Sequence, residues 1–308
     1  MTTSQTSQVI TVQSAVEEFI VSRKLANLSP RTVAWYEEKL GTLLAGLEDL
    51  PLSELTIHVY RDRIATRASQ VKPATVSHHI RAFKTMMRWL AEEDEYTIGL
   101  NPRKIKQMTT EKRNPPVLTK EQVTVLLKQP DQSQWTGRRD NCLLSLLLDT
   151  GIRISEALTA EVGGWDEEQG TLSVIGKGNK QRIVALSLPM RRIMRKWCRV
   201  RAQVCRKQYS DCPAIFLSRR GGALKYRGVA GIIQRYGEKA GIEGVRVSPH
   251  TFRSTFATNF CRDGGSIVHL QTILGHTTME MSRRYAVVAD EDAFESSRKF
   301  SMLADIMK

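Results

Sequence analysis

Long apolar runs are missing from this sequence. No segment approaches the roughly 18 consecutive apolar residues that a membrane-spanning helix needs. The opening residues, MTTSQTSQVI, lack the charged-then-apolar order of a secretory signal. The five cysteines are odd in number and include no CxxC pair, which is typical of a reducing compartment. We therefore expect a cytoplasmic protein with no membrane partner.

Metal ligands are also sparse. Only six histidines occur in 308 residues. Cysteines 198, 205 and 212 recur every seven residues, but no histidine lies near them and zinc sites use ligands in closer pairs. The chain also lacks internal repeats, low-complexity tracts and a glycine-rich phosphate loop. We expect neither a metal nor a cofactor.

Positive charge, by contrast, is abundant. Lysine and arginine number 46 against 32 aspartates and glutamates, which gives a formal net charge of +14. This excess favours a polyanionic partner, and DNA, RNA and anionic membranes all fit it. The length, with 41% hydrophobic residues, allows about two domains with real cores.

The N-terminal part has four segments of helical periodicity. The last segment carries an apolar stripe, and basic side chains recur beside it at steps of three and four residues: Arg81, Lys84 and Arg88. This basic stripe is either a solvated helix face or a DNA contact, and the residues alone leave both open. The four predicted helices cover residues 12–25, 30–46, 53–68 and 73–94.

A polar, basic stretch begins at Asn101-Pro102. It reads NPRKIKQMTTEKRNPPV, contains a Pro-Pro pair and has no hydrophobic periodicity, so it indicates a linker. Thr119, with Gln122 three residues later, has the spacing of a capping box that opens a second domain. We expect a helical domain over 1–108, a linker over 109–117, and a second domain with a C-terminal tail over 118–308.

The second domain starts with helical segments. The apolar run over 140–149 is closed by Gly151, and a new helix is expected from about Ser155, which puts Arg153 in the turn between them. Burying this arginine requires an anion or a carboxylate, and Glu156 is near enough to orient it. A surface arginine at a helix start is the alternative.

The periodicity then changes to that of strands. Two β-rich runs, 171–176 and 181–187, flank KGNK and predict a hairpin. Lys177 at its tip either faces solvent only, or reaches a DNA groove or donates a proton to a leaving oxygen. Lys180 and Arg182 are further candidate DNA contacts.

Residues 248–253 combine a helix start with two basic side chains. Ser248 is suited to the N-cap and Pro249 to the first helical position. His250 and Arg253 then lie on one side of the first turn, where free N–H groups and the helix dipole favour an anion such as phosphate. The alternative is an ordinary helix start without a ligand.

Several motifs occur together and in one order. They are TGIRISEAL, VIGKGNKQR, PHTFR, LGH and RRY, with Arg153, Lys177, His250, Arg253, His276 and Tyr285. In these motifs the chain resembles the tyrosine recombinase (phage integrase) family, and most closely its Xer-like members. The N-terminal SPRTVAWYEEKL resembles that family's core-binding domain. The resemblance implies a mainly α fold with a small β-sheet or hairpin: a helical, SAM-like core-DNA-binding domain followed by an α+β catalytic domain.

The resemblance also implies a reaction. Such recombinases cleave and rejoin DNA through a covalent 3′-phosphotyrosine and a free 5′-hydroxyl, so joining needs neither ATP nor a metal. Arg153 and Arg253 would clamp the nonbridging oxygens, because a guanidinium stays charged and donates two hydrogen bonds at once. The ordinary pKa of a tyrosine is about 10, so its proton must be taken up. His250 would act as general base on Tyr285, and Lys177 as general acid to the 5′-oxygen.

Two further roles follow from the resemblance. His276 would hydrogen-bond the scissile phosphate, and Glu156 would support Arg153. Tyr209, Tyr226 and Tyr236 are rival nucleophiles, but none follows an LGH segment at a suitable spacing. The family usually has proline where RIVAL has Ala185.

The implied partners are double-stranded DNA recombination sites, bound by a homotetramer on two synapsed sites in the nucleoid. Accessory DNA-bending or directionality proteins are compatible with this function, which would be integration or excision of a mobile element, or dimer resolution. The tail after Tyr285 would dock on a neighbouring protomer or on its own domain. The alternatives are a DNA-relaxing enzyme of the type IB topoisomerase class and a noncatalytic DNA-binding protein.

Overall fold

The computed structural model describes residues 9–93, 96–108, 114–176, 180–208, 212–276 and 278–289. Helices dominate this part of the chain, and its strands form one small antiparallel sheet, so the predicted fold class is confirmed. The chain divides into two compact units, Met1–Lys112 and Arg113–Lys308. Within the described ranges, no helix is both long and apolar enough to cross a membrane.

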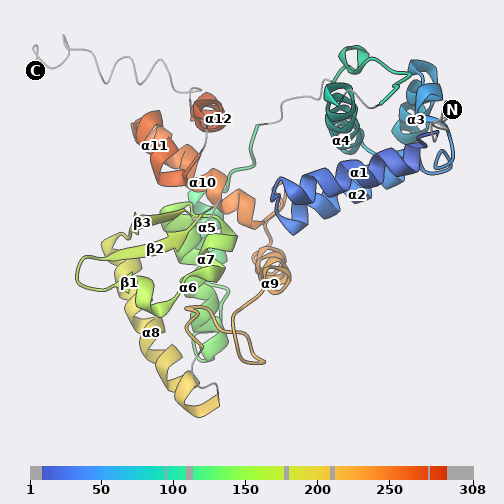
Figure 1. Cartoon of the computed structure of the whole chain (residues 1–308). Helices are drawn as coiled ribbons and strands as arrows, with labels where there is room; N and C mark the ends of the chain where they lie inside the picture. Colours follow the sequence, from blue (N-terminus) through green and yellow to red (C-terminus); the bar gives the residue numbers. More distant parts are fainter. Residues whose placement is uncertain are drawn as a thin grey trace, which may run out of the picture. The chain divides into compact units, whose positions relative to one another are not determined.

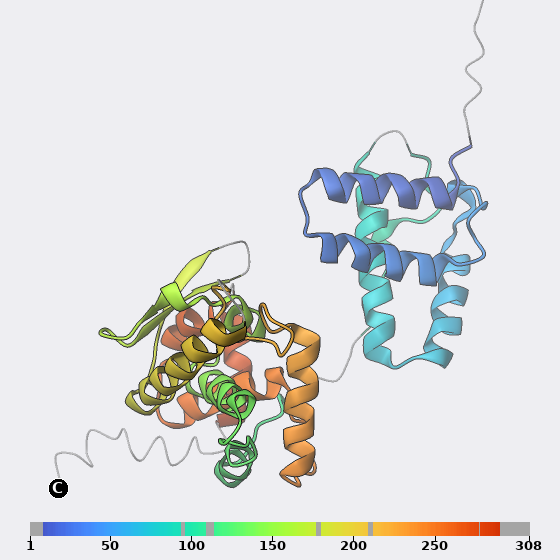
Figure 2. The same cartoon turned by 90° about the horizontal axis from the view of Figure 1, so that it is seen from below.

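The first unit is built from helices. They are α1 (Val12–Leu25), α2 (Pro30–Leu44), α3 (Ile57–Gln70) and α4 (Pro73–Glu92), with short 3-10 helices η1 (Leu52–Glu54) and η2 (Pro102–Lys104). Figure 2 shows α1 and α2 side by side, and both contact α4. Phe83 and Met87 of α4 are fully buried in the core, while Arg81 and Arg88 are exposed and Lys84 is half-buried. α4 therefore separates an apolar face from a basic one.

One sequence-based boundary in this unit is wrong. The third helix begins at Ile57 instead of residue 53, because the Thr56 side chain caps it and Leu52–Glu54 forms a separate 3-10 turn. Of the linker expected over 109–117, residues 109–113 lie outside the described residues. Ile105, which precedes it, is fully buried in the core of the first unit. A single apolar residue in a basic segment forms no periodic pattern, so the sequence does not predict that it is buried.

The second unit surrounds α6 (Trp135–Thr150), which packs against α8 (Leu188–Gln208) and α10 (Pro249–Arg262) (Figure 1). Its apolar run fills the core, with Leu143, Leu146 and Leu147 at most 1% exposed. The capping box predicted at Thr119 and Gln122 is confirmed at the start of α5. The other helices are α5 (Lys120–Leu127), α7 (Ile154–Thr159), η3 (Val162–Gly164), α9 (Tyr226–Lys239), α11 (Ile267–Leu274) and α12 (Met279–Ala289).

The sheet has the order β1-β2-β3 and is antiparallel throughout: β1 (Trp165–Asp166), β2 (Thr171–Ile175) and β3 (Gln181–Ala185). β2 and β3 confirm the predicted hairpin, with Ser173 opposite Ile183. Leu172, Val174 and Val184 are buried, whereas Ile183 is exposed, so the strands alternate between core and solvent. β1, of two residues, is too short to give a sequence pattern and was not predicted.

Candidate active site

The turn that presents Arg153 depends on a glycine. Gly151 ends α6 in the left-handed conformation, with φ of 61°. A Cβ at this position would lie 2.3 Å from Cδ1 of Phe256 on α10, so the close packing of α6 on α10 also requires glycine. The turn places Arg153 at the N-cap of α7 and leaves the Gly151 carbonyl as an acceptor for a side chain of α10.

Glu156 is the centre of an ion-pair network. Its carboxylate is 1% exposed and accepts a hydrogen bond from the Arg153 backbone N–H at 2.8 Å and from Nη1 of Arg153 at 3.0 Å. Arg182 on β3 binds the same carboxylate through Nη1 and Nη2, at 2.7 and 2.8 Å. Burial raises the pKa of the Glu156 carboxyl, but these hydrogen bonds outweigh it and the pKa falls below its ordinary value. The carboxylate is therefore charged and holds both arginines.

Arg253 comes from α10, whose start matches the expected pattern. The Ser248 side chain caps this helix by accepting from the Thr251 N–H, and Pro249 is its first residue. Arg253 is 7% exposed. It donates from Nη1 to the Gly151 carbonyl and from Nη2 to the Leu274 carbonyl, both at 2.8 Å. Backbone acceptors at the C-terminal ends of two helices, α6 and α11, thus fix the guanidinium plane.

Arg153 and Arg253 meet at the end of α11. Arg153 donates from Nη1 to the Leu274 carbonyl at 3.4 Å and from Nη2 to the Gly275 carbonyl at 3.1 Å. Burial and the nearby Arg153 charge lower the pKa of Arg253 to about 10, so it stays protonated at neutral pH. With Arg182 beside them and Glu156 as a balancing carboxylate, the cluster has an excess of positive charge that suits an anion.

His250 lies one turn before Arg253 on α10 and is exposed. Its pKa is lowered, first because neighbouring protein atoms displace part of its hydration and then because Arg253 and Arg284 carry positive charge. At neutral pH the imidazole is therefore unprotonated. An exposed, neutral imidazole beside a guanidinium can accept a proton from a group that approaches it.

His276 and Tyr285 lie against each other. Their rings are stacked, with centroids 6.1 Å apart and planes inclined by 14°, and they are 8% and 6% exposed. The Nδ1 atom of His276 is 2.8 Å from Oγ of Ser282, a residue that belongs to none of the motifs in the sequence. Burial, followed by the charges of three arginines, lowers the pKa of His276 to about 4, so it is neutral near pH 7.

Tyr285 is also near the arginine cluster. Its hydroxyl interacts electrostatically with Arg253 and raises the pKa of that guanidinium. Of the rival tyrosines, Tyr236 donates its hydroxyl to Asp140 at 3.0 Å, and Tyr226 is 55% exposed on α9. Tyr209 lies outside the described residues. The structure thus brings five predicted catalytic side chains to one region: Arg153, His250, Arg253, His276 and Tyr285.

The remaining candidates are placed differently. Lys177 lies outside the described residues, although the strands that carry it are described. Lys180 is exposed near the hairpin tip, whereas both terminal nitrogens of Arg182 bind Glu156. The basic stripe of Arg81, Lys84 and Arg88 belongs to the other unit, on α4. Among the described residues, no three His, Cys, Asp or Glu side chains gather as a metal site would require.

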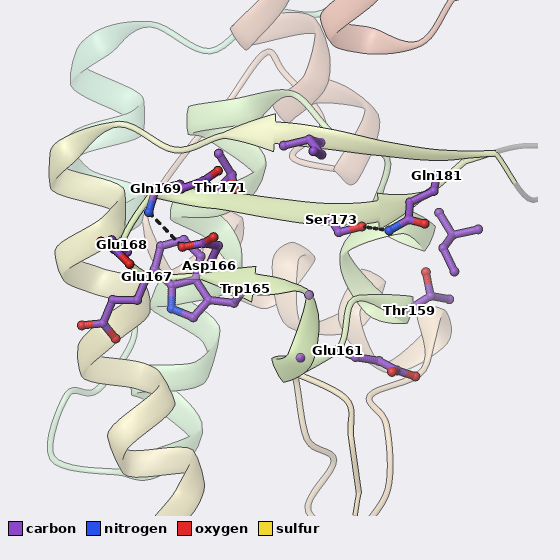
Figure 3. Close-up of a pocket in the computed structure, with 14 residues that line it drawn as sticks. Thr159, Glu161, Trp165, Asp166, Glu167, Glu168, Gln169, Thr171, Ser173 and Gln181 are labelled. Atoms are coloured by element: carbon purple, nitrogen blue, oxygen red, sulfur yellow. Dashed lines mark hydrogen bonds between the residues drawn. The ribbon is translucent and has the colours of Figure 1, made fainter.

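A hollow of about 860 Å³ lies elsewhere, over the solvent face of the sheet (Figure 3). Trp165, Ser173 and Gln181 line it, together with Glu161, Asp166, Glu167 and Glu168. Of the predicted catalytic residues that the structure describes, none contributes to it. The candidate site lies on the opposite face of the sheet. On that face Arg182 of β3 binds Glu156.

Known proteins resemble this chain in sequence. A family model described as the phage integrase family matches residues 116–292. Tyrosine recombinase XerC of Oceanobacillus iheyensis is 31% identical over 278 residues, covering 89% of this chain and 90% of that protein. Tyrosine recombinase XerD of Neisseria meningitidis serogroup B is 30% identical over 295 residues, covering 89% and 95%.

Solved structures share the fold. The XerH site-specific recombinase bound to its palindromic difH substrate gives a TM-score of 0.73 at 19% identity, over 92% of this chain and 83% of that one. A lambda integrase tetramer bound to a Holliday junction gives 0.73 at 17% identity, over 90% and 78%. By the matched family model and the identity to XerC over most of its length, this chain belongs to the phage integrase family of tyrosine recombinases.

Proposed function

We propose that this protein is a site-specific DNA recombinase that breaks and rejoins strands through a covalent bond between Tyr285 and a DNA 3′-phosphate. One observation carries the proposal: Arg153 and Arg253, from different helices, both donate to the carbonyl of Leu274, two residues before His276. His276 in turn stacks on Tyr285. Two fixed cations, a neutral imidazole and a tyrosine are the groups that a phosphodiester transfer requires.

In the proposed reaction the Tyr285 oxygen attacks phosphorus and the bond from phosphorus to the 5′-oxygen breaks. The tyrosine proton passes to His250, whose lowered pKa leaves it free to accept one at neutral pH. The departing 5′-oxygen receives a proton from Lys177. In the reverse sense, a 5′-hydroxyl attacks the phosphotyrosine, so joining conserves the bond energy.

The arginines act on the charge that grows on the phosphate oxygens. Arg153 and Arg253 are already oriented by backbone carbonyls and Glu156, so little reorganisation is needed when the phosphate arrives. His276 is neutral near pH 7 and would donate a hydrogen bond to the same phosphate. Glu156 would keep Arg153 in place without touching the substrate.

We further propose that the partners are duplex recombination sites and that four copies of the chain assemble on two synapsed sites. The net charge of +14 supports binding to DNA. A tetramer on a Holliday junction has been solved for lambda integrase, which shares this fold. The site of action would be the nucleoid, where accessory DNA-bending or directionality proteins would set the outcome.

The test is a covalent adduct. A nicked duplex carrying DNA from beside the gene releases on cleavage a short fragment that begins with the free 5′-hydroxyl, and its loss traps the intermediate. In EDTA, wild type should form a protein-linked strand at one position and Tyr285→Phe should bind the duplex without forming it. Tyr226→Phe, a change at an exposed tyrosine of α9, is the matched control and should form the adduct.

An adduct formed by Tyr285→Phe would show that the nucleophile is misassigned. Tight binding by wild type with no adduct on any flanking sequence would favour a noncatalytic DNA-binding protein. Relaxation of supercoiled plasmids of any sequence would instead favour a topoisomerase.

A further inference from the structure

Ser282 contacts His276 from the helix that carries Tyr285. Its Oγ lies 2.8 Å from Nδ1 of His276, and Ser282 is fully buried. Ser282 precedes Tyr285 by three residues, so the two side chains lie one turn apart on the same side of α12. Because the Tyr285 ring stacks on the same imidazole, α12 contacts His276 both at a ring nitrogen and across a ring face.

The other bonds of His276 involve its backbone. Its N–H donates to the Gln271 carbonyl at 3.0 Å, and Nε2 of Gln271 donates to its carbonyl at 3.3 Å. In the described part of the chain, Ser282 is the hydrogen-bond partner of the imidazole, and Nε2 of His276 has none. The backbone hydrogen bonds thus fix the position of the His276 main chain, and the hydrogen bond to Ser282 fixes the orientation of its imidazole ring.

The direction of the Ser282 bond decides what the free ring nitrogen can do. The pKa of His276 is about 4, so near pH 7 the imidazole carries a single N–H. If the Ser282 hydroxyl donates to Nδ1, the proton lies on Nε2, which can donate to a phosphate oxygen. If Nδ1 donates to Ser282, Nε2 presents a lone pair, which a phosphate repels.

We propose that Ser282 is a positioning residue for phosphate recognition, whose hydroxyl donates to Nδ1 of His276 and holds the imidazole as the Nε2–H tautomer. The inference rests on the proposed function, in which His276 hydrogen-bonds the scissile phosphate. Since Ser282 and Tyr285 share a turn of α12, the same hydroxyl ties the phosphate-binding imidazole to the nucleophile. A displacement of α12 that withdraws Tyr285 also releases His276.

A double-mutant cycle tests this role in the full chain. Single-turnover cleavage of the nicked duplex is measured for Ser282→Ala, His276→Ala and the double variant, with DNA affinity measured in parallel. Ser282→Ala should lower the cleavage rate about 10- to 100-fold, by analogy with the loss of a hydrogen-bond partner of a metal-binding histidine. Affinity should change by no more than about twofold, and Ser282→Thr, which keeps the hydroxyl, should restore cleavage.

The coupling between the two residues decides the outcome. In the His276→Ala background, loss of Ser282 should cost no more than about twofold, because the serine acts through the imidazole. Wild-type cleavage by Ser282→Ala, or the same loss in both backgrounds, would overturn the inference while leaving Tyr285 and the proposed function intact. An adduct with Tyr285→Phe would overturn the proposed function itself, so the two failures are distinguishable.

The tautomer is measured directly by nitrogen NMR, which does not depend on activity. In protein labelled with ¹⁵N-histidine, the His276 signals are assigned by their loss in His276→Gln. Near pH 7, Nδ1 should resonate as an unprotonated nitrogen and Nε2 as a protonated one, and Ser282→Ala should shift the Nδ1 signal. A protonated Nδ1 in wild type contradicts the proposed direction of the hydrogen bond.

Discussion

Arg182 binds Glu156 end-on, with each terminal nitrogen donating to a different carboxylate oxygen at 2.7 and 2.8 Å. This bond joins β3 to α7, and Glu156 also holds Arg153. The strand that follows Lys177 in the sequence is therefore connected, through one buried carboxylate, to Arg153, which is part of the proposed phosphate clamp of Arg153 and Arg253. Bidentate bonds between guanidinium and carboxylate are strong and directional, so the connection is a rigid one.

Glu156→Gln removes the negative charge that Arg153 and Arg182 share and nearly preserves the shape of the side chain. The free energy of unfolding should fall by about 2–4 kcal/mol, since two cations lose their buried partner. The cleavage rate should fall as well, because Arg153 is no longer fixed. Urea unfolding measures the first effect, and Glu161→Gln, at an exposed glutamate, is the control that should leave both unchanged. Equal stability of Glu156→Gln and wild type would contradict a structural role for this network.

Acid should destabilise the fold partly through His276. Its folded pKa of about 4 lies below the ordinary histidine value of 6.5, so between these pH values the unfolded chain binds a proton that the folded chain excludes. Stability should therefore be greatest above pH 6.5 and decline as the pH falls towards 4, by about 3 kcal/mol at most from this residue. Urea unfolding at pH 7.5 and pH 5 should show a smaller decline for His276→Gln. Tyr285→Phe, which keeps the histidine, should decline as wild type does.

Arg253→Lys tests whether planar recognition matters beyond charge. Lysine keeps the charge but cannot bind the Gly151 and Leu274 carbonyls and two phosphate oxygens together. Single-turnover cleavage should fall by about 100-fold or more, with DNA affinity within a few fold of wild type. Arg192→Lys, the same change at an exposed arginine of α8, should cleave normally. Normal cleavage by Arg253→Lys would remove Arg253 from the phosphate clamp.

The basic stripe on α4 makes a prediction about salt. Each of Arg81, Lys84 and Arg88 that contacts a phosphate contributes about one unit to the slope of log affinity against log salt concentration. Glutamine substitutions should therefore flatten the slope by about one unit each. Lys24→Gln on α1, whose lysine pairs with Glu37 at 3.7 Å, is the matched control. If the slope of log affinity against log salt concentration is unchanged by all three substitutions, the basic stripe on α4 is a solvated face.

The sequence was sufficient where a residue pattern is local. Gly151 after an apolar run, Ser248 before Pro249, and the hairpin strands around KGNK each predicted the element that the structure contains. Glu156 was expected to orient Arg153 because the two are three residues apart on one helix start.

Contacts between distant segments had no such signal. Arg182 was expected to bind DNA, and only the fold shows that its two terminal nitrogens face Glu156, 26 residues away in sequence. The carbonyls of Gly151 and Leu274 cannot be recognised as guanidinium acceptors from residue type, since every residue has a carbonyl. Ser282 was missed because its partner is known only once α12 packs back on the LGH turn; its position three residues before Tyr285 was the available clue.

The proposed role of Lys177 as proton donor is best tested with a substrate whose leaving group needs no proton. If it protonates the departing 5′-oxygen, Lys177→Ala should slow cleavage of ordinary DNA by about 10²- to 10⁴-fold. A duplex with sulfur in place of that bridging oxygen has a leaving group that departs as a thiolate and needs no proton, so the variant should cleave it nearly as fast as wild type. Lys196→Ala, at an exposed lysine of α8, should show neither the defect nor the rescue. A defect that persists with the sulfur substrate would assign Lys177 to binding the phosphate, because a lost contact to the nonbridging oxygens slows both substrates alike.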